Sequence, residues 1–387
     1  MNVPGTGSAR IEWAGGQMPV LRSIRARFAA ERPLDGVRVG ACLHVTAETA
    51  NLVLALRDGG ADVALCAANP YTAQPDVAEA LGEGVHVGDY ARSLAAVAEW
   101  GPQLVLDDGA ELIAATHERL RGATEETRSG LVHARSLDLA CPVLAVNESA
   151  AERALNDRFG TGQSALDGIV RATHILLAGQ TVVVIGYGWT GRGIALRARG
   201  AGASVIVCEV DSLRALEARM EGFEVLPALA AAERGDIFVT VTGSRDVLRR
   251  EHFDRMKDGA VLANAGHFDV EIALADLGER PTQVLPLVEQ YEQPDGRRLN
   301  LLAGGQVVNL AAAQGHPAAV MDVSFALQAL STELLAREEL PPGVHPVPDA
   351  IDAEVARLKL EALGVEIDAL TPEQEAYLSR WRRPATP

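Results

Sequence analysis

The sequence is poor in positive charge, and its apolar runs are short. It holds 35 lysines and arginines against 52 aspartates and glutamates, so its formal net charge is −17. Because such a chain has no overall cationic field to gather a phosphate backbone, we expect no nucleic-acid partner. Apolar runs such as Thr181 to Ile185 and Ser204 to Cys208 are far shorter than the ~20 residues of a bilayer crossing. We therefore expect no membrane partner.

Cysteine is also scarce. The four cysteines, Cys42, Cys66, Cys141 and Cys208, are scattered without a C-x-x-C pair, and the N-terminus lacks a charged region followed by an apolar run. We expect reduced thiols, no metal site and a cytoplasmic location. With 387 residues, of which 48% are hydrophobic, the chain is long enough for two folded domains, and its composition excludes disorder.

What is present is an alternation of short β-branched runs with Ala- and Leu-rich helical patterns. It starts with Val37 to Leu43, Ala47 to Arg57, Val63 to Cys66 and Val77 to Leu81. It restarts with strand Thr181 to Ile185, a glycine turn, helix Gly193 to Arg199, strand Ser204 to Cys208 and helix Ser212 to Met220. Such alternation predicts an α/β fold with parallel sheets covered by helices, and a second α/β domain that begins near residue 163.

The later part of the chain continues this pattern and then changes. Strands are predicted at Ile237 to Val241, Ala260 to Ala263 and Gln283 to Pro286, and Val320 to Ala336 is typical of one long apolar helix that returns to the first domain. The proline-rich segment Leu340 to Pro348 indicates a linker, and Ala350 to Leu363 a charged helix.

A glycine motif follows the clearest strand. Gly186, Gly188 and Gly191 form a G-x-G-x-x-G turn between a strand and a helix, which is typical of a dinucleotide pyrophosphate site. The motif alone also occurs as a chance glycine turn. Glu209 ends the next strand, where a carboxylate accepts from the ribose hydroxyls of NAD and repels the 2′-phosphate of NADP. The alternative is that Glu209 is only a solvated strand end.

Eight segments together resemble the S-adenosyl-L-homocysteine hydrolase (adenosylhomocysteinase) family, in the same order and at similar spacing. They are CLHVTAET (42–49), LDDG (106–109), EETRSG (125–130), DGIVRATHILLAG (167–179), GYGWTGRG (186–193), MEGFEV (220–225), NAGHFDVEI (264–272) and QGHPAAVM (314–321).

The resemblance implies a discontinuous substrate domain and a Rossmann NAD-binding domain with a doubly wound parallel sheet. Their ranges are 1–162 and 315–345 for the substrate domain, 163–314 for the NAD-binding domain and 346–387 for a C-terminal segment with a short helical tail. It also implies chemistry in which NAD oxidises the 3′-hydroxyl of an adenine nucleoside. The ketone acidifies the C4′ proton, and loss of that proton expels the 5′ substituent. A homodimer or homotetramer is implied as well.

Residue by residue, the resemblance implies a site in three groups. The catalytic group is His44, Asp108, Glu126, Glu152, Asn156, Asp157 and His267; the substrate group is Thr46, Glu48, Thr127, His316 and Met321; the cofactor group is Gly186, Gly188, Gly191, Glu209, Thr127, Arg128, Ser129, Asn264 and Asn309. Within them, Thr46, Glu48 and His316 match adenine contacts, and His44 and Asp108 match the pair beside the 5′ leaving group.

The sequence departs from the family around the 3′-hydroxyl. Matching outward from Val146-Asn147 and Gly160 places Glu152 at the family's catalytic lysine, Asn156 at its aspartate, Asp157 at its asparagine and Thr161 at its cysteine. Replacing lysine by glutamate reverses the charge and turns a donor into an acceptor. Either Glu152 or Asp157 can supply the base that oxidation needs, because burial beside the nicotinamide raises a carboxyl pKa toward neutrality.

Other departures concern the cofactor. Arg128 replaces the middle threonine of a three-threonine run, and Trp189 replaces an acidic residue in the glycine turn. The family's tail, which ends in a lysine and a tyrosine that reach the NAD of a neighbouring protomer, has no counterpart in the ending 381–387. We expect weaker NAD retention than in the family, and tetramer assembly is put in doubt.

Three functions remain open at this point. The leading hypothesis is an elimination at the 5′ side of an adenine nucleoside, as in the dehydration that forms nucleoside antibiotics of the decoyinine (angustmycin) type. The second is an authentic S-adenosyl-L-homocysteine hydrolase with relocated catalytic groups. The third is an inactive protein that binds NAD and a nucleoside without chemistry.

Overall fold

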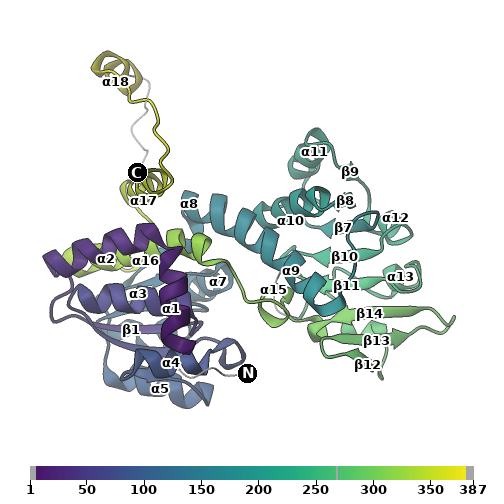
Figure 1. Cartoon of the computed structure of the whole chain (residues 1–387), viewed down its shortest axis with the longest axis horizontal. Coiled ribbons are helices and arrows are strands. Elements are labelled where there is room, and N and C mark those ends of the chain that lie inside the picture. Colours follow the sequence, from purple (N-terminus) through teal and green to yellow (C-terminus); the bar gives the residue numbers. More distant parts are fainter. Residues whose placement is uncertain (1–5, 267–268, 381–387) are drawn as a thin grey trace.

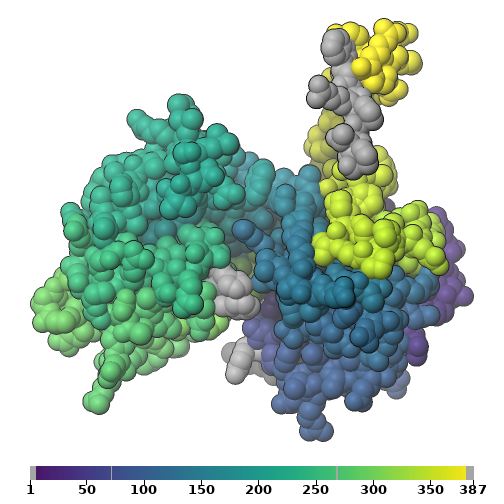
Figure 2. Space-filling view, turned by 180° about the vertical axis from the view of Figure 1, so that it is seen from behind, coloured from purple at the N-terminus to yellow at the C-terminus, as the bar shows by residue number. Residues whose placement is uncertain are grey.

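Two α/β units lie next to each other, each built on its own twisted sheet (Figure 1). The computed structural model describes residues 6–266 and 269–380. Figure 2 shows the same two lobes from behind, with helix α18 (Pro372–Ser379) standing off one of them. The predicted α/β class with a Rossmann-type domain is confirmed.

The first sheet has seven strands, all parallel, in the order β15-β6-β5-β4-β1-β2-β3. Its strands are β1 (Arg38–Leu43), β2 (Asp62–Ala67), β3 (Val85–His86), β4 (Leu104–Asp107), β5 (Gly122–Glu125), β6 (Pro142–Ala145) and β15 (Gly343–Pro346). The central strands are buried on both faces, which is why they read as continuous apolar runs rather than as alternation.

The second sheet has eight strands in the order β12-β13-β14-β11-β10-β7-β8-β9. Its strands are β7 (Thr181–Ile185), β8 (Ser204–Cys208), β9 (Glu224–Val225), β10 (Ile237–Thr240), β11 (Val261–Asn264), β12 (Thr282–Leu285), β13 (Val288–Glu292) and β14 (Arg298–Leu302). Strands β12, β13 and β14 pair antiparallel, so the sheet is parallel except at this edge.

Helices cover both faces of both sheets (Figure 1). The α-helices are α1 (Thr6–Gly16), α2 (Pro19–Glu31), α3 (Ala47–Asp58), α4 (Pro75–Leu81), α5 (Tyr90–Trp100), α6 (Glu111–Thr116), α7 (Arg128–Ser136), α8 (Ala150–Glu152), α9 (Gly162–Thr173), α10 (Trp189–Gly200), α11 (Ser212–Met220), α12 (Ala228–Ala232), α13 (Arg250–Phe253), α14 (Leu274–Leu277), α15 (Val308–Ala311), α16 (Ala318–Arg337), α17 (Asp349–Ala362) and α18 (Pro372–Ser379). Short 3₁₀ turns are η1 (Pro70–Thr72), η2 (His117–Arg119), η3 (Val146–Glu148) and η5 (Ala303–Gly305).

One continuous helical segment runs from the first unit into the second. It consists of α8, a π-helical stretch η4 (Arg153–Thr161) and α9. Helix α10 crosses it closely at Gly162 and Gly193, because a Cβ at Gly193 would lie 1.9 Å from the Arg158 carbonyl oxygen. The crossing fixes the position of η4 against the NAD-binding unit, and π-helical turns are often found at functional sites.

Helix α16 is the central helix of the first core. It packs against α2 and α3 and contributes Phe325, Leu327 and Leu335 to the same buried cluster as those helices. By length and composition alone it is the one described helix that is apolar enough to cross a membrane, and 78% of that stretch is buried inside the protein. The long apolar helix that the sequence predicts at Val320 to Ala336 is thereby confirmed, with bounds Ala318–Arg337.

Two sequence predictions are wrong in detail. The segment Leu340 to Pro348 is more than a linker, because residues 343–346 form strand β15 on the edge of the first sheet. The prolines of this segment argue against a strand in the sequence, but a strand at the edge of a sheet tolerates proline. Helix α10 begins at Trp189, four residues before the predicted start. Thr190 and Gly191 are weak helix formers, and the contact with η4 overrides that local preference.

Candidate active site

A cleft of about 3000 Å³ lies where the carboxyl ends of both sheets face each other. A single small-ligand pocket usually measures about 300–1,000 Å³, so the cleft has room for a dinucleotide and a second molecule. Seventeen of the predicted site residues line it: His44, Thr46, Glu48, Asp108, Glu126, Thr127, Arg128, Ser129, Glu152, Asn156, Asp157, Gly186, Gly188, Glu209, Asn309, His316 and Met321. Gly191 and Asn264 lie beneath the lining, and His267 lies outside the described residues.

The glycine turn forms a cradle that only glycine permits. Gly186 has φ +104°, and a Cβ there would lie 2.7 Å from the Val241 carbonyl oxygen. A Cβ at Gly191 would lie 2.0 Å from the Gly186 carbonyl oxygen. The turn leads directly into the N-terminus of α10, where free backbone N–H groups and the helix dipole favour a phosphate. The geometry therefore fits the pyrophosphate of a dinucleotide.

Glu209 follows strand β8 and is fixed by the backbone around it. Its carboxylate accepts hydrogen bonds from the N–H groups of Tyr187 at 2.7 Å, Val210 at 2.6 Å and Asp211 at 3.0 Å. These bonds hold a negative charge beside the glycine turn. At this position the Glu209 carboxylate can accept hydrogen bonds from the ribose hydroxyls of NAD, and its negative charge repels the 2′-phosphate of NADP.

We expect the Glu209→Ala variant to bind NAD more weakly by about 1–3 kcal/mol, because a charge-assisted hydrogen bond is lost. Wild-type protein should bind NAD in preference to NADP, since the carboxylate repels the added phosphate. Calorimetric titration of both cofactors measures these affinities. Glu217→Ala, on the exposed side of α11, is the matched control. Equal affinities of the wild type for NAD and NADP would contradict the assignment.

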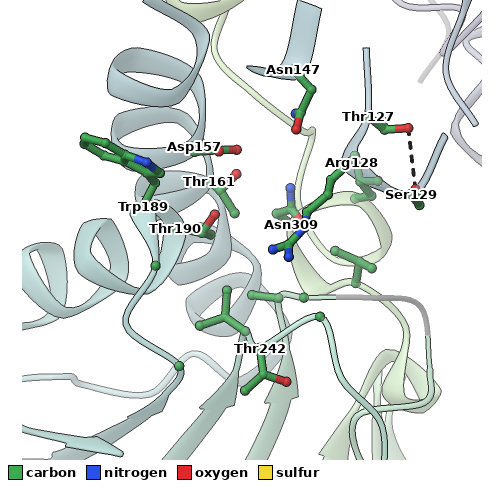
Figure 3. A pocket seen from close by; sticks show the side chains of 18 of the residues that line it. Thr127, Arg128, Ser129, Asn147, Asp157, Thr161, Trp189, Thr190, Thr242 and Asn309 are labelled. Carbon is green, nitrogen blue, oxygen red and sulfur yellow. Dashed lines mark hydrogen bonds between the residues drawn. The ribbon is translucent and has the colours of Figure 1, made fainter. Parts of the chain in front are cut away.

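The far wall of the cofactor side comes from the first unit and from α15 (Figure 3). The Arg128 side chain extends from the start of α7 toward Asn309, while Thr127 and Ser129 form a hydrogen bond of 3.5 Å at its base. The buried Oδ1 atom of Asn309 has no hydrogen-bond partner among the described residues. This oxygen is therefore available to accept a hydrogen bond from a molecule bound in the cleft. Trp189 stands at the cleft edge with 45% of its surface exposed.

His44 and Asp108 form a proton-handling pair on the substrate side. His44 Nε2 lies 3.5 Å from Asp108 Oδ2, and His44 Nδ1 lies 2.6 Å from the Thr72 hydroxyl. That hydroxyl already donates to the Asn69 carbonyl at 2.9 Å, so it accepts from His44 and places the proton on Nδ1. Nε2 is then the nitrogen with the free lone pair, and it faces Asp108. Burial raises the pKa of Asp108, which lets the pair hold a transferable proton.

The predicted adenine contacts gather at the N-terminus of α3 and opposite it. Thr46 caps the helix by accepting from the Thr49 N–H at 3.4 Å, and Glu48 lies in its first turn. Across the cleft, His316 Nε2 lies 2.9 Å from the Thr161 hydroxyl, and burial lowers the His316 pKa to about 4, so this ring is neutral. The side chains of Thr46, Glu48 and His316 therefore present hydrogen-bonding groups to the same cleft.

The segment where the family carries lysine is acidic here. Glu152 ends α8 and is 2% exposed, Asn156 in η4 is 6% exposed, and the Asn156 Nδ2 lies 3.9 Å from Met321 Sδ. Asp157 and Thr161 face the cleft from the same helix (Figure 3). Lysine is absent from the cleft lining, and the only two lysines of the sequence form ion pairs elsewhere. No relocated lysine therefore replaces the missing one within the described residues.

Burial raises the pKa values of the acids around this segment. The pKa of Asp157 rises to about 6 although Arg153 and Arg128 favour its charged form. The pKa of Glu126 rises to about 7. Burial and the neighbouring carboxyl groups of Glu126 and Asp157 hold the pKa of Glu152 well above its usual value. Groups poised near neutrality can accept and return protons at physiological pH.

Two buried carboxylates that the sequence reasoning missed hold the lining loops in place. Glu125 accepts from the N–H groups of Gly109, Ala110 and Thr127 and from the Thr127 hydroxyl, at 2.7–3.0 Å. Glu271 accepts from the N–H groups of residues 242 and 243 at 3.0 and 2.7 Å. Both residues lie inside the resembling segments, but only the folded structure shows that they act on the loops. Among the described residues, no group of three or more His, Cys, Asp or Glu is placed to hold a metal ion.

Two family models match the chain. Residues 1–120 match the model described as S-adenosyl-L-homocysteine hydrolase, and residues 157–315 match its NAD-binding domain. The NAD prediction from the glycine turn is thereby confirmed.

Curated relatives match almost the whole chain. It is 52% identical to the S-inosyl-L-homocysteine hydrolase of Methanopyrus kandleri, with 97% of this chain and 95% of that protein covered. It is 50% identical to the adenosylhomocysteinase of Thermosynechococcus vestitus and 51% identical to that of Aquifex aeolicus, with 97% of this chain covered and 94% and 96% of those proteins.

Among solved structures, a dipicolinate synthase chain from Bacillus halodurans aligns with a TM-score of 0.55 at 15% identity. The alignment covers 79% of this chain and all of that one. At this identity the likeness concerns the fold alone.

Proposed function

The chain belongs to the S-adenosyl-L-homocysteine hydrolase family, and on that premise we propose that it oxidises the sugar of a purine nucleoside beside C4′ and then breaks the bond between C5′ and its substituent. One observation carries the proposal. The cradle for NAD, the His44–Asp108 pair and the acids Glu152 and Asp157 line the same cleft. Oxidation and elimination need these groups around one sugar.

Each group has a role that follows from its chemistry. Bound NAD supplies a hydride acceptor for the sugar carbon and later returns the hydride. A carboxylate of the Glu152 and Asp157 segment takes the proton of the hydroxyl that is oxidised. The resulting ketone makes the C4′–H acidic, so that a base removes its proton and the electrons expel the 5′ substituent. Asp108 and His44 handle the protons of C4′ and the leaving group.

The first candidate for the 5′ substituent is a homocysteine thioether. Its support is that the relatives at about 50% identity are named hydrolases of S-adenosyl- or S-inosyl-L-homocysteine. In this reading the acidic segment replaces the family lysine as the base for the 3′-hydroxyl. Water then adds at C5′ and the ketone is reduced again.

The second candidate is a 5′-hydroxyl, whose loss is a dehydration of the kind found in nucleoside-antibiotic formation. It is favoured by the replacement of the family lysine with Glu152 and by the protonatable carboxyl of Asp108. Hydroxide is a far poorer leaving group than a thiolate, so its departure requires an acid. An acidic cleft without lysine suits that requirement.

Product analysis separates the two candidates. The NAD-loaded protein is incubated separately with S-adenosylhomocysteine, S-inosylhomocysteine and free purine nucleosides, and thiol release, water loss and bound reduced nicotinamide are followed. We expect the absorbance of reduced nicotinamide with at least one of these substrates. Homocysteine release assigns the hydrolase, and an unsaturated nucleoside assigns the dehydratase. Both candidates would be contradicted if the protein binds NAD but forms neither homocysteine nor an unsaturated nucleoside from any of these substrates.

A further inference from the structure

The first turn of helix α8 donates hydrogen bonds to a distant part of the chain. Asp352, on helix α17, accepts from the backbone N–H of Ala150 at 2.8 Å through Oδ2 and from that of Ala151 at 3.1 Å through Oδ1. The next N–H, that of Glu152, donates to the side chain of Ser149 at 3.1 Å. The first N–H groups of a helix have no partner within the helix. Here three of them are satisfied, two by a carboxylate about 200 positions later in the chain.

Helix α17 is fixed on the first unit by the face that carries Asp352. Val355 and Lys359 follow Asp352 at a spacing that puts all three side chains on one face of a helix. Val355 is 0% exposed and belongs to the buried cluster of the first unit. Lys359 Nζ lies 2.8 Å from Oδ2 of the fully buried Asp322 and also donates to the Ala319 carbonyl at 2.9 Å. The helix packs against α16, α2 and α8 (Figure 1), so Asp352 reaches α8 from an anchored position.

The acidic segment of the cleft lies between two fixed points. Glu152 ends α8, and η4 follows with Asp157. Beyond η4, helix α10 crosses the segment closely at Gly162 and Gly193. That crossing ties the far end of the segment to the NAD-binding unit, whereas the bonds to Asp352 tie its start to the first unit. Glu152 directly follows the two residues whose N–H groups Asp352 holds, so its side chain moves with that turn.

We propose that Asp352 is a positioning residue for the redox chemistry of the cleft: by holding the first turn of α8, it sets the place of the Glu152 carboxyl. This inference rests on the proposed function, in which a carboxylate of this segment takes the proton of the hydroxyl that is oxidised. Asp352 does not itself line the cleft, so it acts only through the turn that it holds. Helix α17 is thereby part of the support of the active site.

The turn depends on Asp352 because it has little other stabilisation. Helix α8 has only three residues before the helix widens into the π-helical η4. Wide turns of this kind are rare, and so short a helix is not stable by itself. The side chain of Ala150 is exposed and that of Ala151 is half-buried, so neither adds much packing. Without the Asp352 carboxylate, two N–H groups lose their partners, and the turn must open toward water to regain them.

Hydrogen exchange tests these bonds without any substrate. In the NAD-loaded protein, Asp352→Asn should speed exchange of the amides of residues 150–152 by about 10-fold or more, because one amide oxygen replaces a charged carboxylate with two acceptors. Asp352→Glu keeps the carboxylate but lengthens the side chain, and it should give a smaller increase. Asp349→Asn is the matched control, because it removes the same charge from an exposed position one turn earlier on α17, and it should exchange as the wild type does.

Two results of the exchange experiment would overturn the proposal. The first is unchanged exchange of amides 150–152 in both Asp352 variants. The second is an equal increase throughout the first unit, or loss of folding in both variants, which would show that Asp352 stabilises the whole fold rather than this turn. A gain confined to the start of the acidic segment supports the proposal.

A kinetic experiment tests the role in the chemistry. At saturating nucleoside, Asp352→Asn should slow nicotinamide reduction by about 10–100-fold, the usual effect of a misplaced catalytic group. NAD affinity should stay at the wild-type value, because the glycine turn and Glu209 lie in the other unit. Asp352→Glu should recover part of the rate, and Asp349→Asn should leave it unchanged.

A double-mutant cycle shows whether Asp352 acts through Glu152. In the Glu152→Gln background, Asp352→Asn should change the rate of nicotinamide reduction by less than about twofold, because the group that it positions is already lost. Equal losses in both backgrounds would contradict the positioning role. If no nucleoside reduces the nicotinamide in the wild type, the proposed function fails, while the exchange result still decides whether Asp352 holds the turn.

Discussion

Replacing Asp157 by asparagine, or Glu152 by glutamine, should lower the rate at which a nucleoside reduces bound NAD by about 10²–10⁴-fold, the usual contribution of a general base. Both substitutions nearly preserve shape and remove only the ability to take a proton. Both side chains line the cleft on the segment where the family has its lysine and asparagine. Stopped-flow absorbance of the reduced nicotinamide measures the step directly.

The control for this prediction is Asp167→Asn, an exposed position on α9 of the same continuous helix. It should reduce the nicotinamide at the wild-type rate. The pH dependence gives a second check, because the base must be ionised. Burial raises the Asp157 pKa to about 6, so the wild-type rate should climb as pH increases through this value. Normal reduction in both carboxyl variants would show that the base lies elsewhere.

Replacing His44 or Asp108 by asparagine should have a different effect of similar size. The first oxidation should proceed and leave reduced nicotinamide on the protein, while loss of the 5′ substituent slows by about 10²–10⁴-fold. The reason is that the pair lies on the substrate side of the cleft, with the His44 proton fixed on Nδ1 and Nε2 free for transfer. Rapid-quench analysis of the nucleoside, together with nicotinamide absorbance, separates the two steps.

His86→Asn, in strand β3 and outside the cleft lining, is the control and should behave as the wild type. The leaving group changes the size of the effect. A thiolate departs with little help, so Asp108→Asn should slow a 5′-hydroxyl substrate more than a thioether. If His44→Asn and Asp108→Asn both abolish nicotinamide reduction, the pair belongs to the oxidation step and the assignment is wrong.

Much of the NAD-binding unit could be predicted from local sequence. Strands 181–185 and 204–208 and helix 212–220 have the predicted bounds, because apolar periodicity and glycine positions are local signals. Strand β15 could not be predicted, because its prolines argue against a strand. Only its pairing with β6, some 200 residues earlier in the chain, identifies it as one. Pairing partners at such separations leave no local trace.

The same limit applies to the site. The resembling segments indicated which residues to expect, and the cleft brings 17 of them together. They did not show that Glu126 bonds to Ser324 and Gln328, because 198 and 202 positions separate these partners in the chain. Nor could a single sequence show that Glu125 and Glu271 hold the lining loops. These roles depend on contacts between residues far apart in the chain, so only the folded structure reveals them.

The central claim is that a ketone beside C4′ drives the elimination, and solvent exchange at C4′ tests it most directly. The NAD-loaded protein is incubated in deuterium oxide with purine nucleosides that carry either a 5′-hydroxyl or a 5′-homocysteine thioether, and recovered substrate and product are examined by proton NMR and mass spectrometry. The account predicts deuterium at C4′ or loss of the C4′ hydrogen, accompanied by reduced nicotinamide during turnover. Cleavage at C5′ with the original hydrogen retained at C4′ and no change in nicotinamide absorbance would contradict it.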